Sequence, residues 1–319
     1  MKKLLMISGK GATDTALGKK NAFYNTLTEL RTHFERIDIV CPQISNFKFQ
    51  ISNEFSNVFF HLEVPDRKFD IMTVHEYAPF SNGRLANKIW EKTKTPMIFE
   101  IMHIPGMPKA GSWKERVAKL VTRFYIAHDV CHASAVRVIN NQVGDWLIRA
   151  GVPKDKIKLI PAMYIDLDIF KPMNLEKKYD MIFVGRRAKN KGIELFEKAG
   201  RGFKTLIVDG WAKDSQEIAH LLNQSKLLIM SSYNEGGPRV VLEALACGIP
   251  VLATPVGIVP EVLPKEWIID WNADNIAQKA RKILSENAIV PKIDWSNFEK
   301  KSTIKNYAEF INSYTRIQT

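Results

Sequence analysis

The chain has 319 residues, which is enough for two ordinary domains that each bury a core of their own. Apolar residues make up 45% of it and charged residues 25%, as in soluble globular proteins. The formal net charge is +12, but the basic residues are spread along the chain. They show no helix-turn-helix, zinc-finger or basic aromatic spacing, so we predict no nucleic-acid partner.

Cysteine usage and hydropathy favour a cytoplasmic protein. The three cysteines are scattered and form no Cys-x-x-Cys pair, which argues against disulfides and zinc. Only a short apolar run, Leu4–Ile7, follows the start of the chain, so we expect no secretion signal. The most apolar long stretch, 240–263, contains glutamate, glycine and prolines and is not expected to span a membrane.

In the first half of the chain, short apolar runs typical of strands alternate with segments whose apolar residues recur at helical spacing. This alternation favours a parallel sheet. Phe23, Leu27, Leu30 and Phe34 recur at helical spacing after a glycine-bearing loop. The predicted strands are 4–7, 37–41, 58–62, 71–74, 97–101, 136–139 and 158–160.

A segment of mixed charge containing Pro172, 161–178, is the best domain boundary, and the alternation restarts after it. The predicted strands there are 181–184, 205–208, 227–230 and 250–253, with helices at 272–285 and 295–314. Only one strand-helix step fits between Thr205 and Leu227. We therefore predict an α/β fold with two doubly wound domains, which place ligands at the carboxyl ends of their strands.

The most informative segment is Ser231–Thr254. An apolar strand, 226–230, ends in a turn through Gly236 and Gly237, and a helix follows. Free backbone N–H groups at such a helix start suit a phosphate. Two carboxylates, Glu235 and Glu243, bracket the turn with seven residues between them and can accept hydrogen bonds from hydroxyls. A phosphate together with hydroxyls indicates a sugar nucleotide. The simpler interpretation is a surface helix with two solvated glutamates.

This segment, with its Cys-Gly-Ile-Pro-Val exit, resembles the Glu-x7-Glu signature of retaining GT-B glycosyltransferases, especially glycosyltransferase family 4 (glycosyl transferases group 1). The resemblance implies that Glu235 contacts the donor sugar and that Glu243 accepts the ribose hydroxyls. It also implies that backbone N–H groups of Arg239, Val240 and Val241 face the phosphates. The resemblance does not decide whether the Arg239 side chain contacts a phosphate or points to solvent.

A second motif, 183–192, ends the first strand of the second domain in Gly-Arg-Arg-Ala-Lys-Asn-Lys-Gly. It resembles the family's Gly-Arg-…-Lys-Gly element, with Arg186 and Lys191 at the matching positions. The resemblance implies that these cations bind the pyrophosphate in place of a metal ion, so we expect neither a metal nor a cofactor. Taken without the first motif, the run is a solvated basic turn.

The first-domain candidates are Gly9 and Gly11, in a glycine loop after the first strand, and His103, which follows another strand. The loop matches the family only loosely and would line the cleft. His103 would lie near the reacting face of the sugar, although a lone histidine is as often packed or solvated. His75–Glu76 is a weaker candidate for the acceptor side, and Asp166 ends a stretch without the family's Asn-Gly.

The segment 112–124 has a helical apolar stripe, with Arg116, Lys119 and Arg123 beside it. It is either a helix docked on its sheet with a solvated basic rim or a surface that touches an anionic membrane. The second possibility predicts peripheral attachment to the inner face of the cell membrane.

The sequence thus predicts a GT-B protein with an acceptor-side domain 1–163, a nucleotide-sugar domain 173–296 and a helix 297–319 that crosses back to the first domain. We expect a retaining, metal-independent hexosyltransferase with a UDP- or GDP-linked donor rather than an ADP-linked one. Its acceptor would be a glycan or a lipid-linked hydroxyl in surface polysaccharide or glycolipid synthesis. Three alternatives stay open: another GT-B enzyme such as an epimerase or phosphorylase, a non-catalytic sugar-nucleotide-binding protein, and a basic polyanion-binding module.

Overall fold

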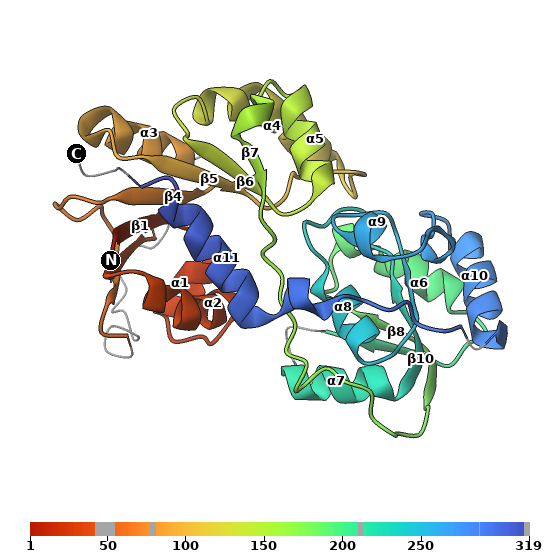
Figure 1. Cartoon of the computed structure of the whole chain (residues 1–319). Coiled ribbons are helices and arrows are strands. Elements are labelled where there is room, and N and C mark those ends of the chain that lie inside the picture. Colours follow the sequence, from red (N-terminus) through yellow and green to blue (C-terminus); the bar gives the residue numbers. More distant parts are fainter. Residues whose placement is uncertain (42–54, 77–80, 210–212, 287, 316–319) are drawn as a thin grey trace. The chain divides into compact units, whose positions relative to one another are not determined.

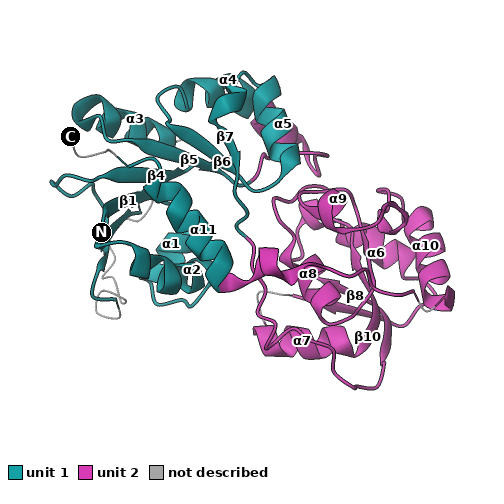
Figure 2. Cartoon of the chain, in the orientation of Figure 1, with its two compact units in different colours: residues 1–102, 121–162, 301–319 teal, residues 103–120, 163–300 magenta. Residues whose placement is uncertain are grey.

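Figure 1 shows the computed structural model of the chain, which describes residues 1–41, 55–76, 81–209, 213–286 and 288–315. The chain divides into two compact units (Figure 2). The first comprises Met1–Met102, Val121–Ala162 and Lys301–Thr319, and the second comprises His103–Leu120 and Met163–Lys300. Each unit has its own parallel sheet with helices around it, as predicted.

The first unit is built on a seven-stranded sheet in the order β3-β2-β1-β4-β5-β6-β7, with every pairing parallel. The strand order reverses between β1 and β4, which makes the sheet doubly wound. Its strands are β1 (Lys3–Ile7), β2 (Arg36–Val40), β3 (Val58–His61), β4 (Ile71–His75), β5 (Met97–Ile101), β6 (Ala135–Val138) and β7 (Ile157–Leu159).

Helices lie on both faces of this sheet (Figure 1). They are α1 (Lys10–Ala16), α2 (Ala22–Leu30), α3 (Ser81–Thr93), the part of α4 (Trp113–Asp129) from Val121 onward, α5 (Asn141–Arg149) and α11 (Lys300–Asn312), with 3₁₀ turns η1 (Arg31–His33) and η2 (Lys154–Lys156). Asn21 and Asn140 cap α2 and α5 by accepting the N–H groups of Tyr24 and Val143. The helix predicted through Phe34 ends earlier, because its last turn tightens to η1 and Phe34 is extended.

Helix α11 packs on the first unit through a buried polar cluster. The guanidinium of Arg137 in β6 lies 3.7 Å from the ring centroid of Tyr307 in α11. The same group pairs with Glu100 of β5 at 2.6 Å, and both side chains are nearly inaccessible, at 5% and 6%. Its other donors bond to the carbonyls of Ile160 and Pro161. Each of the three guanidinium nitrogens thus has a hydrogen-bond partner within the unit.

The second unit has a four-stranded parallel sheet in the order β11-β10-β8-β9. Helices α6 and α10 contact each other, as do α7 and α8. Its strands are β8 (Tyr179–Val184), β9 (Thr205–Val208), β10 (Ser225–Met230) and β11 (Val251–Ala253). Its helices are α6 (Ile193–Ala199), α7 (Ser215–Asn223), α8 (Arg239–Ala246), α9 (Val259–Val262) and α10 (Ala273–Glu286), with turns η3 (Lys189–Lys191), η4 (Lys265–Trp267) and η5 (Trp295–Phe298).

The boundaries of the units differ from the predicted domains 1–163, 173–296 and 297–319. Residues 103–120 group with the second unit, because their backbone pairs with the Ser231–Thr254 motif. Lys109 N–H donates to the Tyr233 carbonyl, and Pro108 forms an isolated bridge with Asn234. The chain from Lys301 groups with the first unit, as α11 does.

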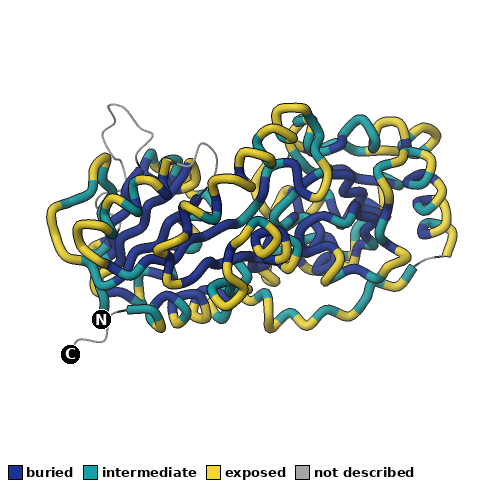
Figure 3. The backbone as a smooth tube through the Cα atoms, turned by 90° about the horizontal axis from the view of Figure 1, so that it is seen from above, coloured by how far each residue is buried: buried dark blue, intermediate teal, exposed yellow. Residues whose placement is uncertain are grey.

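The cores of both units lie at their sheets, where inner strands such as β1, β5 and β10 are mostly buried (Figure 3). Helix α4 departs from this arrangement. Its buried residues are Thr122, Ile126 and Asp129, whereas its apolar stripe is exposed. The prediction that this stripe docks on the sheet is therefore wrong for the described structure.

Candidate functional site

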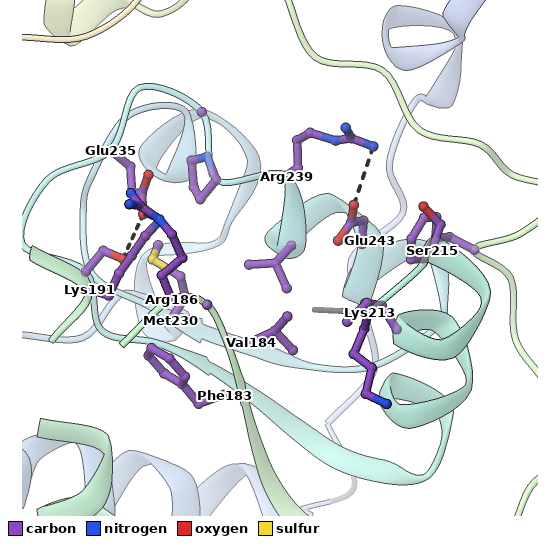
Figure 4. Close-up of a pocket in the computed structure, with 17 residues that line it drawn as sticks. Phe183, Val184, Arg186, Lys191, Lys213, Ser215, Met230, Glu235, Arg239 and Glu243 are labelled. Atoms are coloured by element: carbon purple, nitrogen blue, oxygen red, sulfur yellow. Dashed lines mark hydrogen bonds and ion pairs between the residues drawn. The ribbon is translucent and has the colours of Figure 1, made fainter. Parts of the chain in front are cut away.

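The second unit has a cavity of about 330 Å³ at the carboxyl ends of β8 and β10 (Figure 4). From these central strands the chain crosses in opposite directions, to β9 and to β11, so the strand order switches here. Ligands of open α/β sheets bind at such a point. The lining residues are Phe170, Phe183, Val184, Gly185, Arg186, Lys191, Lys213, Ser215, Ile218, Met230, Ser232, Glu235, Gly237, Pro238, Arg239, Val240 and Glu243.

Glu235 lies at one end of the cavity beside the turn that follows β8 (Figure 4). Its carboxylate forms an ion pair with Lys191 and accepts a hydrogen bond from Ser232 Oγ at 3.0 Å. The side chains of Lys191 and Glu235 are 20% and 16% exposed, so a bound molecule can reach both. The fold thus joins the two predicted motifs, whose paired residues are 44 positions apart.

Arg186 also lines this end of the cavity, and its side chain lies beside Lys191 in Figure 4. Arg186 and Lys191 thus bring two cationic side chains to the end of the cavity where Glu235 lies. Cationic groups at the end of a strand favour an anionic ligand.

Gly192 explains why the two motifs can lie so close. Its φ of +63° is in the left-handed region, and a Cβ there would overlap the carbonyl oxygen of Ser231. Ser231 Oγ donates to the Gly192 carbonyl at 2.8 Å. Only glycine permits this approach of backbones without strain.

Glu243 lies at the other end of the cavity, on α8, with Arg239 one turn before it (Figure 4). The two side chains are 3.6 Å apart, and the guanidinium also lies 5.7 Å from the ring centroid of Tyr164. Burial raises the pKa of Glu243 above its usual range, and Arg239 opposes that rise. Arg239 therefore lines the cavity, with its side chain 37% exposed.

Helix α8 begins at Arg239, and its first turn faces the cavity. Val241 donates its N–H to the carbonyl of Pro238 at 3.1 Å. This N–H therefore already has an acceptor within the protein. The N–H groups of Arg239 and Val240 belong to the first turn, where no intrahelical acceptor exists.

The two glycines of the turn have different surroundings. Gly237 lines the cavity and abuts the side chain of Met163. The carbonyl of Gly236 lies against Gly257, whose φ is +58°, and a Cβ on Gly257 would overlap that carbonyl. Gly257 is thus the residue that lets the turn pack on the loop after β11.

His103 lies beside the motif rather than in the cavity wall. Its Nε2 is 3.1 Å from Oδ1 of Asn234, the residue before Glu235. Asn234 donates from Nδ2 to Glu115 Oε2 at 3.0 Å and to the Lys109 carbonyl at 3.2 Å. Sequence reasoning missed Asn234 and Glu115, because residues more than 100 positions apart give no local signal.

Of the remaining candidates, Gly9, Gly11 and His75 belong to the first unit. Gly9 precedes the short helix α1 of the first unit, and Gly11 lies within that helix. His75 ends β4 in the same unit, and burial lowers its pKa. Asp166 closes a turn by accepting the N–H groups of Asp168 and Ile169.

Sequence reasoning also missed four lining residues, Phe170, Lys213, Ser215 and Ile218. The last three lie in or just before the start of α7. A capping box marks that start, with Asp214 and Glu217 exchanging side-chain and backbone hydrogen bonds. An Asp-x-x-Glu spacing is visible in a sequence and could have predicted this helix start next to the cavity.

No three histidine, cysteine, aspartate or glutamate side chains gather as metal ligands within the described ranges. Among the helices of those ranges, none combines the length and the apolar character that crossing a bilayer requires.

Comparison with solved structures identifies the class of fold. The Anabaena protein HepE, in a crystal structure with UDP and glucose, superposes with a TM-score of 0.70 over 98% of this chain and 100% of that one, at 13% sequence identity. The chain therefore has the GT-B fold of glycosyltransferases, as the sequence predicted.

Sequence comparison matches part of the chain to a family model. Residues 204–308 match the model of glycosyl transferases group 1, which confirms the predicted resemblance. An uncharacterized 41.2 kDa protein in the cps region of Klebsiella pneumoniae is 24% identical over 301 residues, 78% of either chain. A putative teichuronic acid biosynthesis glycosyltransferase of Bacillus subtilis strain 168, TuaC, is 33% identical over 103 residues, 26% of either chain.

Proposed function

We propose that the protein transfers a sugar from a nucleoside-diphosphate sugar to an acceptor hydroxyl, with retention of the anomeric configuration. One observation carries the proposal. A single cavity has Lys191, Arg186 and Glu235 at one end and Glu243 with Arg239 at the other (Figure 4). These groups match the charges and hydroxyls of a sugar nucleotide.

The donor would lie between the two ends. Glu243 would accept the ribose hydroxyls, and the N–H groups of Arg239 and Val240 with the side chain of Arg186 would face the diphosphate. Lys191 would exchange part of its contact with Glu235 for the phosphate next to the sugar. Side-chain cations then neutralise the leaving group without a metal ion. We favour UDP or GDP as the carrier, and the UDP bound to HepE makes UDP the first choice.

Glu235 would hold the sugar hydroxyls and stabilise the positive charge that develops on the ring. His103, beside the same loop, would contact the sugar near its reacting face. In the transfer, the bond from the anomeric carbon to the phosphate oxygen breaks, and a bond to the acceptor oxygen forms on the same face. The acceptor proton passes to the departing phosphate oxygen. The departing nucleoside diphosphate thus acts as the base that deprotonates the acceptor hydroxyl, and no covalent sugar-enzyme intermediate is needed.

The acceptor would be a growing surface polysaccharide or a glycolipid. The names of the Klebsiella and Bacillus relatives, which refer to a cps region and to teichuronic acid, support this setting. We propose a cytoplasmic protein that meets its acceptor at the inner face of the cell membrane.

The exposed face of α4 would provide the membrane contact. Trp113, Val117, Leu120 and Phe124 recur along one side of the helix and are 69%, 50%, 56% and 72% exposed. Lys114, Arg116 and Arg123 are exposed beside them. Aromatic and aliphatic side chains flanked by cations match the interface of an anionic bilayer.

Nucleotide binding tests the donor site. Thermal unfolding of the wild type should shift upward with one nucleoside diphosphate, by about 2.7 kcal/mol of stability at a hundred times its dissociation constant. Lys191→Ala should weaken this shift, whereas Lys189→Ala should not, because Lys189 lies in the same turn but outside the cavity. No shift with any nucleoside diphosphate, or equal shifts in both variants, would refute the site.

Product analysis tests the reaction. NMR of the product should show the anomeric configuration of the donor, and an inverted product would exclude the retaining route. Conversion of the donor sugar without an acceptor would instead indicate an epimerase. Binding without any turnover would indicate a non-catalytic sugar-nucleotide-binding protein.

A further inference from the structure

A three-residue hydrogen-bond chain connects helix α4 to the motif loop. It runs from the Glu115 carboxylate through the side chain of Asn234 to the ring of His103. Asn234 is only 1% exposed, so water does not compete for its amide. All three residues belong to the second unit.

The two acceptors next to Asn234 fix the orientation of its side-chain amide. A carboxylate and a carbonyl can only accept, so Nδ2 must face Glu115 and Lys109. Oδ1 therefore faces His103, and the ring nitrogen 3.1 Å away, Nε2, must carry a hydrogen. The neutral imidazole then presents Nδ1 as its hydrogen-bond acceptor.

Glu115 also holds the beginning of α4. Its Oε2 accepts the Gly111 N–H at 2.7 Å, and its own N–H donates to Ser112 Oγ at 3.3 Å. In an ordinary capping box, the glutamate bonds only to the backbone at the helix start. Here one oxygen serves both the backbone of Gly111 and the side chain of Asn234.

We propose that Glu115 is a positioning residue for transfer, because through Asn234 it fixes the tautomer and the orientation of His103. The inference rests on the proposed function, in which His103 contacts the donor sugar. Without the carboxylate, the Lys109 carbonyl is the remaining acceptor that holds Nδ2, so the Asn234 amide can rotate by half a turn more easily and offer its NH₂ group to the ring. His103 would then lose the single tautomer that leaves Nδ1 available to a sugar hydroxyl.

Three variants separate positioning from helix capping. Glu115→Ala removes both roles, and Glu115→Gln keeps an oxygen that accepts from Asn234 and Gly111. Ser112→Ala removes the hydroxyl at the helix start but does not touch Asn234. Each variant is measured for kcat, donor KM and the thermal shift with the nucleoside diphosphate. Nitrogen-15 NMR of histidine-labelled protein reports the tautomer of His103 and needs no turnover.

Glu115→Ala should lower kcat by about 10- to 100-fold, the usual cost of losing a group that orients a reactive one. Donor KM and the nucleotide shift should stay near wild type, since the cavity is intact. Glu115→Gln should recover most of kcat, and Ser112→Ala should remain close to wild type. The NMR pattern should change from a single Nε2–H tautomer to a mixture in Glu115→Ala alone.

Two results would overturn the inference: an unchanged His103 tautomer in Glu115→Ala, or an equal loss of kcat in Glu115→Ala and Ser112→Ala. A wild type that binds nucleotide but transfers no sugar would refute the proposed function instead. The NMR comparison would still decide whether Glu115 orients His103.

Discussion

The two units use charged side chains in opposite ways. In the first, Arg137 and Glu100 are buried beneath α11. The guanidinium of Arg137 donates its hydrogen bonds to Glu100 and to backbone carbonyls of the same unit. In the second, Lys191 and Glu235 form an ion pair that remains partly exposed in a cavity. A buried pair with fixed partners serves structure, whereas an accessible pair can exchange its partner for a ligand.

The carboxylates of the two units differ in the same way. Glu100 accepts from Arg137 at 2.6 Å, a short bond in a dry environment. Glu243 is largely buried but lies 3.6 Å from Arg239, which leaves its oxygens poorly matched. An imperfectly paired carboxylate in a cavity indicates a binding site more strongly than a well-paired one in a core.

The largest effect is expected from Glu235→Ala. It removes the acid next to the sugar and should lower kcat by about 10²–10³-fold or more, while the loop position leaves unfolding almost unchanged. Glu197→Ala is the matched control, because Glu197 is exposed and does not line the cavity. Steady-state transfer assays measure both variants, and normal turnover by Glu235→Ala would contradict the site assignment.

Arg137→Leu should affect the other unit. Loss of the guanidinium leaves Glu100 buried without its partner and should reduce the free energy of unfolding by about 3–5 kcal/mol. Denaturant titration measures the loss, and Arg149→Leu, at an exposed arginine of α5, is the control. If the comparison between the units holds, folded Arg137→Leu protein still binds the nucleoside diphosphate with wild-type affinity. A large loss of nucleotide affinity would show that the buried pair also supports the site.

The exposed face of α4 gives a third test. Trp113→Ser combined with Phe124→Ser removes two exposed aromatic rings and should weaken binding to vesicles of anionic lipid by about tenfold or more. Ile289→Ser is the control, because Ile289 is 92% exposed but lies far along the chain from α4. Sedimentation with vesicles measures binding, which should also weaken in high salt. Equal binding by the wild type and the double variant would remove α4 as the membrane contact.

The smallest effect concerns pH. Because burial raises the pKa of Glu243, its carboxylate takes up a proton at a higher pH than a solvated glutamate does. In the ligand-free protein this protonation adds stability that is lost as the pH rises through the raised pKa. Nucleotide binding has the opposite sign, since the carboxylate accepts both ribose hydroxyls better than the acid does.

Affinity for the nucleoside diphosphate should therefore fall severalfold as the pH drops through this pKa. Calorimetric titration at several pH values measures it, and Glu243→Gln should flatten the dependence. The 2′-deoxy nucleotide should bind the wild type less tightly and lose most of the pH dependence. If Glu243→Gln showed the same pH dependence of affinity as the wild type, a group other than Glu243 would be the one that titrates.

Much of the fold was predictable because the signals lie within short segments. Every predicted strand is found with its ends shifted by no more than a few residues, as for β8, predicted at 181–184 and observed at Tyr179–Val184. Strands of a parallel sheet are buried on both faces, so they appear in the sequence as short apolar runs that are easy to recognise. The two motifs around Lys191 and Glu235 were readable for the same reason, since each turn and its strand are continuous in sequence.

Tertiary structure decided what depends on residues far apart. His103 and Asn234 are 131 positions apart, and no periodicity predicts their contact or the grouping of 103–120 with the second unit. The sequence could not predict that the apolar stripe of α4 faces outward, because the same helical spacing of apolar residues is expected whether the stripe packs on a sheet or on a bilayer. The sequence by itself determined which segments become strands and which turns carry charge. The packed fold alone determined which charges meet, because that depends on the spatial order of strands and not on their order in the chain.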